Sequence, residues 1–199
     1  MYTKFSQFLL LIFLFGCGND NMPNTEVISI NDAFFFQKDT YFFTLINCDS
    51  KENILDFRKS EDGKSFLYIG KEDKSTIYRE NCSTKNYSIS QITTNDLVDN
   101  SDIYLDISMC TKNMDADIKE DFKIYLNFIN LNNISVFSAI SQLDNNKFLW
   151  VNIWPSKLER LNSLDKLIKS PNAQSISDSL KKYGACDSPD LINFTYENA

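Results

Sequence analysis

The chain contains no histidine, and its 199 residues include only 5 glycines and 4 prolines. Without histidine, Ser-His-Asp triads, Cys-His pairs and most hydrolytic zinc sites are excluded. A GxSxG nucleophile elbow and a phosphate-binding P-loop are missing too. Two SxxK strings, Ser163–Lys166 and Ser179–Lys182, are short enough to occur by chance, and we interpret them as exposed helix faces. We therefore predict no enzyme activity, no catalytic residue, no metal site and no cofactor.

The chain also lacks an apolar run long enough to cross a membrane. Its longest run, Phe8–Phe15, is far shorter than the roughly 20 residues that span a bilayer. Lys4 precedes this run and Gly16-Cys17 follows it, which is the order of a secretory signal peptide. The sequence predicts a signal peptide over residues 1–16, a tether over 17–26 and a single globular domain over 27–199.

The end of this signal carries one further pattern, Leu14-Phe15-Gly16-Cys17. It resembles the lipobox of bacterial lipoproteins. The resemblance implies cleavage before Cys17, acylation of its thiol and a membrane anchor. Gly18 and Asn19 follow, where an Asp would retain a Gram-negative lipoprotein in the inner membrane, so the resemblance implies the outer membrane, facing the periplasm. The alternative is an ordinary signal peptide with an incidental cysteine.

Four further cysteines remain, an even number in a chain predicted to reach an oxidising compartment. Two disulfides are therefore expected. The competing zinc site is disfavoured because the chain has neither a CxxC pair nor a histidine. Three pairings are open. We favour the one in which each bond ties segments within one half of the molecule: Cys48–Cys82 and Cys110–Cys186.

Positive charge is in short supply, because 20 Lys and Arg face 27 Asp and Glu, a net charge of −7. Removing the signal takes away Lys4 and no acid, which makes the charge more negative by one. Nucleic-acid recognition rests on clustered Lys and Arg, so it is not expected. An acidic body fits a basic protein partner, with plain solubility as the competing interpretation. The 43% hydrophobic content argues against disorder.

From Val27 to Met109 the pattern is one of short strands separated by turns. Residues 41–46 are rich in β-formers, and Asp62-Gly63 between two apolar runs predicts a hairpin, since glycine reaches positive φ without steric cost. Such spacing is typical of an antiparallel meander.

In the second half, apolar residues alternate with polar ones over 122–128, which predicts another strand, and residues 144–147 predict a hairpin. Ser156 and Glu159 form a capping box, followed by an apolar stripe that predicts a helix to Lys169. That stripe comprises Leu158, Leu161, Leu164, Leu167 and Ile168. A second helix ends at Gly184 and a strand closes the domain. The predicted fold class is α+β: a mainly antiparallel β-sheet with two C-terminal helices packed on one face.

Two groups of residues are candidates for partner contacts. The first is a carboxylate-rich segment with Asp115, Asp117, Glu120 and Asp121, which we otherwise interpret as a solvated acidic loop. It lacks the glycine of a calcium loop. The second is Trp150 and Trp154, which point to the same face of a strand and are most simply core residues. Tryptophan is, however, enriched in protein interfaces.

Three classes of function are compatible with these features. The first is a membrane-anchored periplasmic protein that binds a protein partner, for example as an immunity or inhibitor protein. The second is a structural or assembly lipoprotein of the envelope or of a secretion system. The third is a glycoside hydrolase that uses paired carboxylates. The sequence favours the first, because it needs no catalytic group and suits a small acidic domain on a lipid tether.

Overall fold

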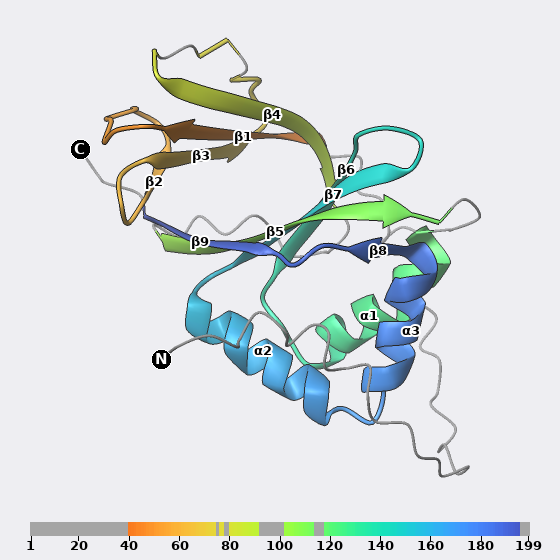
Figure 1. The fold of residues 1–199 in the computed structure, drawn as a ribbon. Coiled ribbons are helices and arrows are strands. Elements are labelled where there is room, and N and C mark those ends of the chain that lie inside the picture. Colours follow the sequence, from red (N-terminus) through yellow and green to blue (C-terminus); the bar gives the residue numbers. More distant parts are fainter. Residues whose placement is uncertain (1–39, 75, 78–79, 92–101, 114–117, 196–199) are drawn as a thin grey trace, which may run out of the picture.

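The fold is known from a computed structural model that describes residues 40–74, 76–77, 80–91, 102–113 and 118–195 (Figure 1). Within these residues the chain forms nine strands and three helices. The strands are β1 (Thr40–Cys48), β2 (Arg58–Ser60), β3 (Ser65–Gly70), β4 (Cys82–Gln91), β5 (Asp102–Lys112), β6 (Phe137–Gln142), β7 (Lys147–Trp154), β8 (Gly184–Cys186) and β9 (Asp190–Thr195). The helices are α1 (Ile118–Leu131), α2 (Lys157–Lys169) and α3 (Ala173–Tyr183).

The strands close into an antiparallel barrel, so the predicted fold class is wrong. The order β7-β6-β4-β1-β3-β2-β9-β5 returns to its start because β5 also pairs with β7. β8 extends this arrangement beside the end of β5. Closure depends on β5, whose 11 residues pair with β7 along one edge and with β9 and then β8 along the other. A strand's alternation of apolar and polar residues identifies its faces but not its neighbours, so the sequence predicted an open sheet.

The second error in the predicted fold is local: the strand expected over 122–128 is part of helix α1. Phe122, Leu126 and Ile129 are buried and lie at helical spacing, so the segment carries a period of 3.6 as well as a period of 2. The described residues therefore form three helices, and only the two C-terminal ones were predicted.

Two cores share the barrel wall. The barrel interior is filled by side chains from alternate strand positions, as in other barrels of about eight strands. Its buried members are Phe43, Leu45, Leu67, Ile69, Ile89, Ile103, Leu105, Phe137, Ala139, Leu149, Val151, Ile153 and Phe194. The second core lies outside the barrel, where the helices cover β5 and β7 (Figure 1). There Phe122, Ile176 and Tyr183 pack against Phe148 and Trp154.

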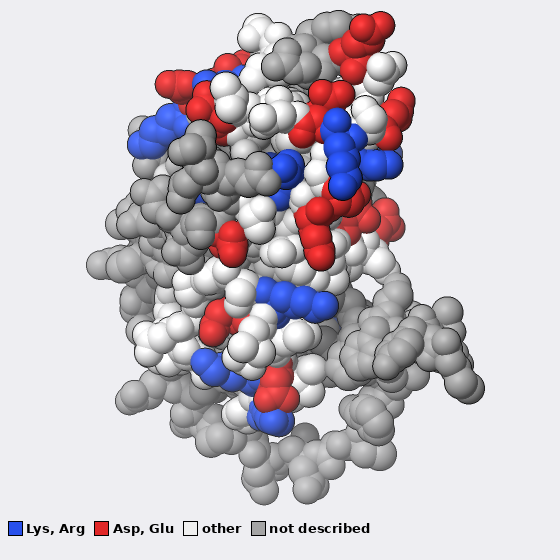
Figure 2. Space-filling view, turned by 90° about the vertical axis from the view of Figure 1, so that its left-hand side faces the viewer, with Lys and Arg blue, Asp and Glu red and all other residues white. Residues whose placement is uncertain are grey.

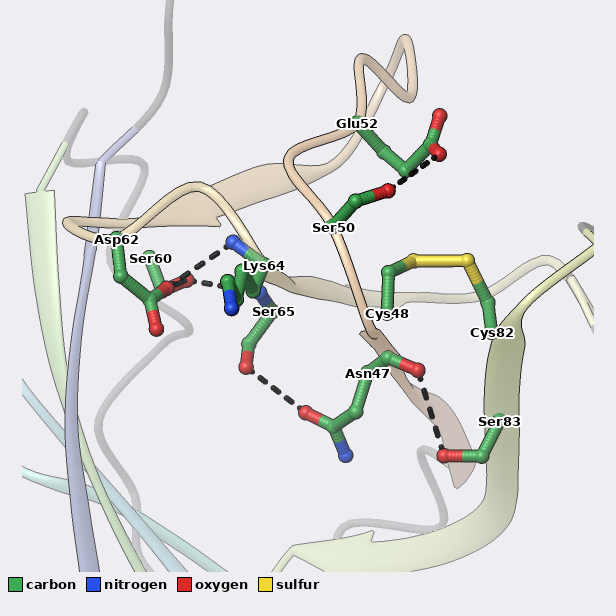
Figure 3. The surroundings of a disulfide bond; sticks show 10 residues. All are labelled: Asn47, Cys48, Ser50, Glu52, Ser60, Asp62, Lys64, Ser65, Cys82 and Ser83. Atoms are coloured by element: carbon green, nitrogen blue, oxygen red, sulfur yellow. Dashed lines mark hydrogen bonds between the residues drawn. A yellow bond between two sulfur atoms is a disulfide. The ribbon is translucent and has the colours of Figure 1, made fainter.

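A third, smaller core covers another part of the barrel exterior. Ile46, Phe66 and Cys48 of the wall pack against Ile54 and Phe57 of the β1–β2 connection. Figure 3 shows this end of the barrel, where the Cys48–Cys82 disulfide joins the end of β1 to the start of β4. The second disulfide, Cys110–Cys186, joins β5 to β8. Both favoured pairings are confirmed.

Local sequence signals explain the turns and the helix ends. The predicted hairpin turn is confirmed at Gly63, which has a φ of 71°. Its neighbour Asp62 accepts hydrogen bonds from the Ser60 hydroxyl and the Lys64 amide (Figure 3), and the Ser60 bond is the main reason why the pKa of Asp62 is lowered. The predicted N-cap of α2 is confirmed too, because Ser156 Oγ accepts from the Glu159 amide at 3.1 Å.

Gly184 ends α3, as predicted, but for a different reason. Its backbone is extended, and a Cβ atom at this position would lie 2.5 Å from the Thr111 carbonyl oxygen of β5. Glycine therefore permits the close pairing of β8 with β5 and is not needed for a left-handed helix end. Among the helices described, none combines the length and apolarity required to cross a bilayer.

Candidate functional site

Helix α2 is unusual because its two buried residues are polar, while three apolar side chains lie among the charged residues of its exposed surface. The buried residues of α2 are Arg160 and Ser163, each 7% exposed. Leu158, Leu161 and Ile168 are 64%, 48% and 46% exposed. We call these three residues the α2 ridge. The sequence predicted that this stripe would pack on the sheet, and the structure shows that most of it faces outward.

The Arg160 side chain explains the orientation of the helix. Its Nε donates to Asp106 Oδ2 on β5 at 2.9 Å, and both side chains are almost fully buried. Burial raises the pKa of the Asp106 carboxyl above its ordinary value, and the nearby guanidinium opposes this rise. A buried charge that loses its partner is costly, so the ion pair strongly favours the rotation of α2 that turns Arg160 inward.

A row of buried polar groups continues from this ion pair under the helices. Asn152 of β7 lies directly opposite Asp106, and Ser138 of β6 lies directly opposite Asn152. The Ser138 hydroxyl donates to Asn152 Oδ1 at 2.5 Å. Tyr125 of α1 hydrogen-bonds to Ser138, and burial raises the pKa of its phenol. This polar row links α2 to α1 across three strands. It therefore holds the helix that carries the ridge in a fixed position.

The surface around the ridge carries both signs of charge. On α2, Lys157, Lys166 and Lys169 accompany Glu159 and Asp165, and Lys169 pairs with Asp165 at 2.7 Å. Figure 2 shows both signs of charge in its lower half, at the level of the helices, with uncharged surface around them. The upper half, formed by the barrel, is more densely charged. An apolar centre with a charged surround is the usual composition of a protein-binding patch.

The predicted contact residues are placed differently. Trp154 is buried and Trp150 is half-buried, and both belong to the core beneath the helices. Phe122 lies edge-to-face with Trp150 at 5.2 Å between ring centroids. The interpretation of the tryptophans as core residues is therefore confirmed.

The acidic segment is only partly described. Asp115 and Asp117 lie outside the described residues. Glu120 and Asp121 are in the first turn of α1, with Glu120 exposed and Asp121 half-buried. Carboxylates in the first turn stabilise a helix through its dipole. Glu120 and Asp121 thus have a structural role whether or not a partner contacts them. Cys17 also lies outside the described residues.

The SxxK strings are not the exposed helix faces that we expected. Ser163 is buried under α2, and the Ser179 hydroxyl donates to the Asp121 carbonyl oxygen of α1. Both serines are therefore buried, whereas Lys166 and Lys182 of the two strings are exposed. In the described ranges, no three Asp, Glu, Cys or His side chains are grouped closely enough to hold a metal ion.

Sequence reasoning missed the α2 ridge and the ion pair beneath it. Arg160 lies within the predicted helix, but its partner Asp106 is 54 positions away and on another element. The sequence of α2 gives no signal for this pair, because charged residues between the positions of an apolar stripe occur in any amphipathic helix. No protein-family model matches the chain, and no curated protein matches it significantly.

Proposed function

We propose that the protein is a lipoprotein, anchored at Cys17 in the outer membrane, whose domain binds a protein partner through the α2 ridge. One observation carries the binding proposal: α2 directs Leu158, Leu161 and Ile168 outward while burying an arginine and a serine. Each such side chain is worth about 1.5–3 kcal/mol when fully buried, so leaving three exposed sacrifices stability. A partner that covers them recovers this free energy.

The geometry of the ridge supports binding rather than simple exposure. Interface hot spots are compact, rigidly held apolar clusters surrounded by polar residues. The Arg160–Asp106 pair fixes the helix on the barrel at 2.9 Å. A tether over residues 17–26 would keep the domain close to the membrane and so raise its local concentration near membrane-bound partners.

The net charge of −7 supports a basic partner. Attraction over long distances raises the association rate, and salt weakens it, because the Debye length falls from about 30 Å at 0.01 M to about 8 Å at 0.15 M. For a basic partner the association rate should therefore drop steeply over this range. A rate independent of salt would remove the electrostatic part of the proposal and leave the ridge.

The test is photo-crosslinking of the full chain in the cells that make it. A photoreactive amino acid at position 161 should give a discrete adduct with one protein. The matched control places it at position 55, because Leu55 is 72% exposed and lies in the loop between β1 and β2. A discrete adduct from position 161 alone supports binding through the ridge. No adduct from position 161, or the same adducts from both positions, would contradict it.

A further inference from the structure

Strand β4 has one edge that is largely unpaired. Along its β1 edge it forms nine residue pairs, from Thr40–Ser90 to Cys48–Cys82. Along its other edge only Ser90 and Gln91 pair, with Ile140 and Ala139 of β6. In the described part of the chain no strand pairs with residues 82–89 on that side. Two residue pairs thus close the barrel between β4 and β6. Within the described residues, most of this β4 edge has no paired strand.

The register identifies the backbone groups on this edge. Cys48 and Cys82 are directly opposite with a Cα–Cα distance of 4.0 Å, which fits the close, non-hydrogen-bonded type of antiparallel pair. Consistently, the Cys48 amide donates away from β4, to the Lys64 carbonyl oxygen at 2.8 Å. The pair types alternate along the strands, so Thr84, Asn86 and Ser88 direct both N–H and C=O away from β1, towards the open edge.

This edge is also held in a fixed shape. The Cys48–Cys82 disulfide ties one end of it to β1, and the pairing with β6 holds the other end. Between these ends, Thr84 and Ser88 are exposed. Asn86 is fixed because it accepts a hydrogen bond from Thr44 at 2.5 Å and donates one to Asp73 at 3.0 Å. Because the β4 edge is already ordered, little free energy is lost in ordering it when a strand docks, which favours affinity.

Unpaired N–H and C=O groups at the spacing of a strand are recognised by the backbone of another extended chain. The inward-facing neighbour on β4 is Tyr87, which is half-buried and lies 6.2 Å from Phe43 between ring centroids. It offers an aromatic contact to the side chain that lies opposite it on an added strand. Lys85 is exposed and is the one charged residue of β4, and a lysine on an edge disfavours pairing with a second copy of the same edge.

We infer that the β4 edge binds an extended segment of a partner protein, which adds a strand to the barrel beside Thr84, Asn86 and Ser88. This inference deepens the proposed function and rests on it only in taking the partner to be a protein. It does not use the α2 ridge. The recognised chemistry is an extended peptide backbone with an apolar side chain opposite Tyr87.

The test measures amide hydrogen exchange by NMR on the full chain in detergent micelles. The probe is a synthetic peptide with the sequence of residues 135–143, because β6 is the strand that already pairs with the end of β4. Adding it should slow exchange of the Thr84, Asn86 and Ser88 amides at least about tenfold, as the loss of water-exposed donors requires. The same peptide with N-methyl groups on alternate amides, which cannot donate, should have no effect.

Two variants separate backbone from side chain. Thr84→Pro removes one edge N–H and should weaken peptide binding about three- to tenfold, the usual net value of one hydrogen bond. Thr84→Val keeps the N–H and should bind within about twofold of the original chain. Unchanged exchange at all three amides would overturn the inference even if Thr84→Pro fails to fold. Protection that appears without peptide and grows with protein concentration would overturn it in favour of a second copy.

The test is independent of the proposed function. Crosslinking at position 161 can fail while the edge amides respond to peptide, and the reverse can hold too. The two results therefore identify which of the two proposals is wrong.

Discussion

At the scale of single residues, Arg160 decides how α2 is used. An arginine in a helix is usually exposed, and here it is turned inward to Asp106. The consequence is that Leu158, Leu161 and Ile168 of the apolar stripe are turned outward, while its other two leucines stay half-buried. One buried ion pair thus converts an ordinary amphipathic helix into one that presents an apolar surface.

Removing one partner of the Arg160–Asp106 pair should strongly lower the free energy of unfolding. Arg160→Met leaves a buried carboxylate without its counter-charge, so we expect the free energy of unfolding to fall by about 3–5 kcal/mol. Chemical denaturation measures it. The matched control is Lys169→Met, which breaks the exposed pair with Asp165 and should cost less than about 1 kcal/mol. Equal losses in the two variants would mean that Arg160 does not orient α2.

At the scale of elements, residues 118–131 show most clearly how the predicted strand differs from the observed helix. In a strand, Phe122 and Ile124 would share a face. In α1, Phe122 is 1% exposed and Ile124 is 38% exposed. Helix and strand periods coincide over short apolar segments, which is why the sequence did not distinguish them.

The two residues should therefore respond differently to truncation. Phe122→Ala opens a cavity beneath the helices and should lower the free energy of unfolding by about 3–5 kcal/mol. Ile124→Ala should change it by less than about 1 kcal/mol, because the side chain is partly exposed. Thermal or denaturant unfolding of the two variants checks this. Comparable losses of free energy in the two variants would instead support a strand over residues 122–128.

The disulfides should contribute unequally. Mass spectrometry of the non-reduced protein should show both bonds, and removing either one should cost about 2–5 kcal/mol. Cys110–Cys186 closes a loop of 76 positions and Cys48–Cys82 one of 34. In the chain-entropy account the longer loop stabilises more, by about 0.7 kcal/mol. Paired Cys→Ser variants measure the difference. Four free thiols in protein taken from the periplasm would contradict the expected compartment.

At the scale of the whole molecule, what the sequence predicts well is local. The caps, turns and hairpins depend on neighbouring residues, and so Ser156, Gly63 and the turn at 144–147 were correctly placed. The disulfide pairing also followed, because it ties each half of the chain to itself. Closure of the barrel and the pairing of Arg160 with Asp106 depend on residues far apart in sequence. The fold class and the α2 ridge could not be predicted for the same reason.

The proposed anchor concerns the whole chain and has its own test. Cys17→Ser removes the thiol that is acylated in the lipoproteins the signal resembles. We expect the variant to lose incorporation of labelled palmitate and to leave the membrane fraction. A single acyl chain binds a membrane only weakly whereas several hold firmly, so partial acylation should give partial release. Continued labelling and sedimentation of the variant would exclude Cys17 as the anchor.

The central claim is that the α2 ridge binds the partner, and its most direct measurement is the dissociation constant for the protein captured from position 161. Leu161→Gln with Ile168→Gln removes two apolar contacts and should weaken binding by at least about 2 kcal/mol, roughly thirtyfold, while the free energy of unfolding changes little. Leu55→Gln, the matched exposed control, should leave the constant unchanged. An unchanged constant in the double variant, with the fold intact, would contradict the account.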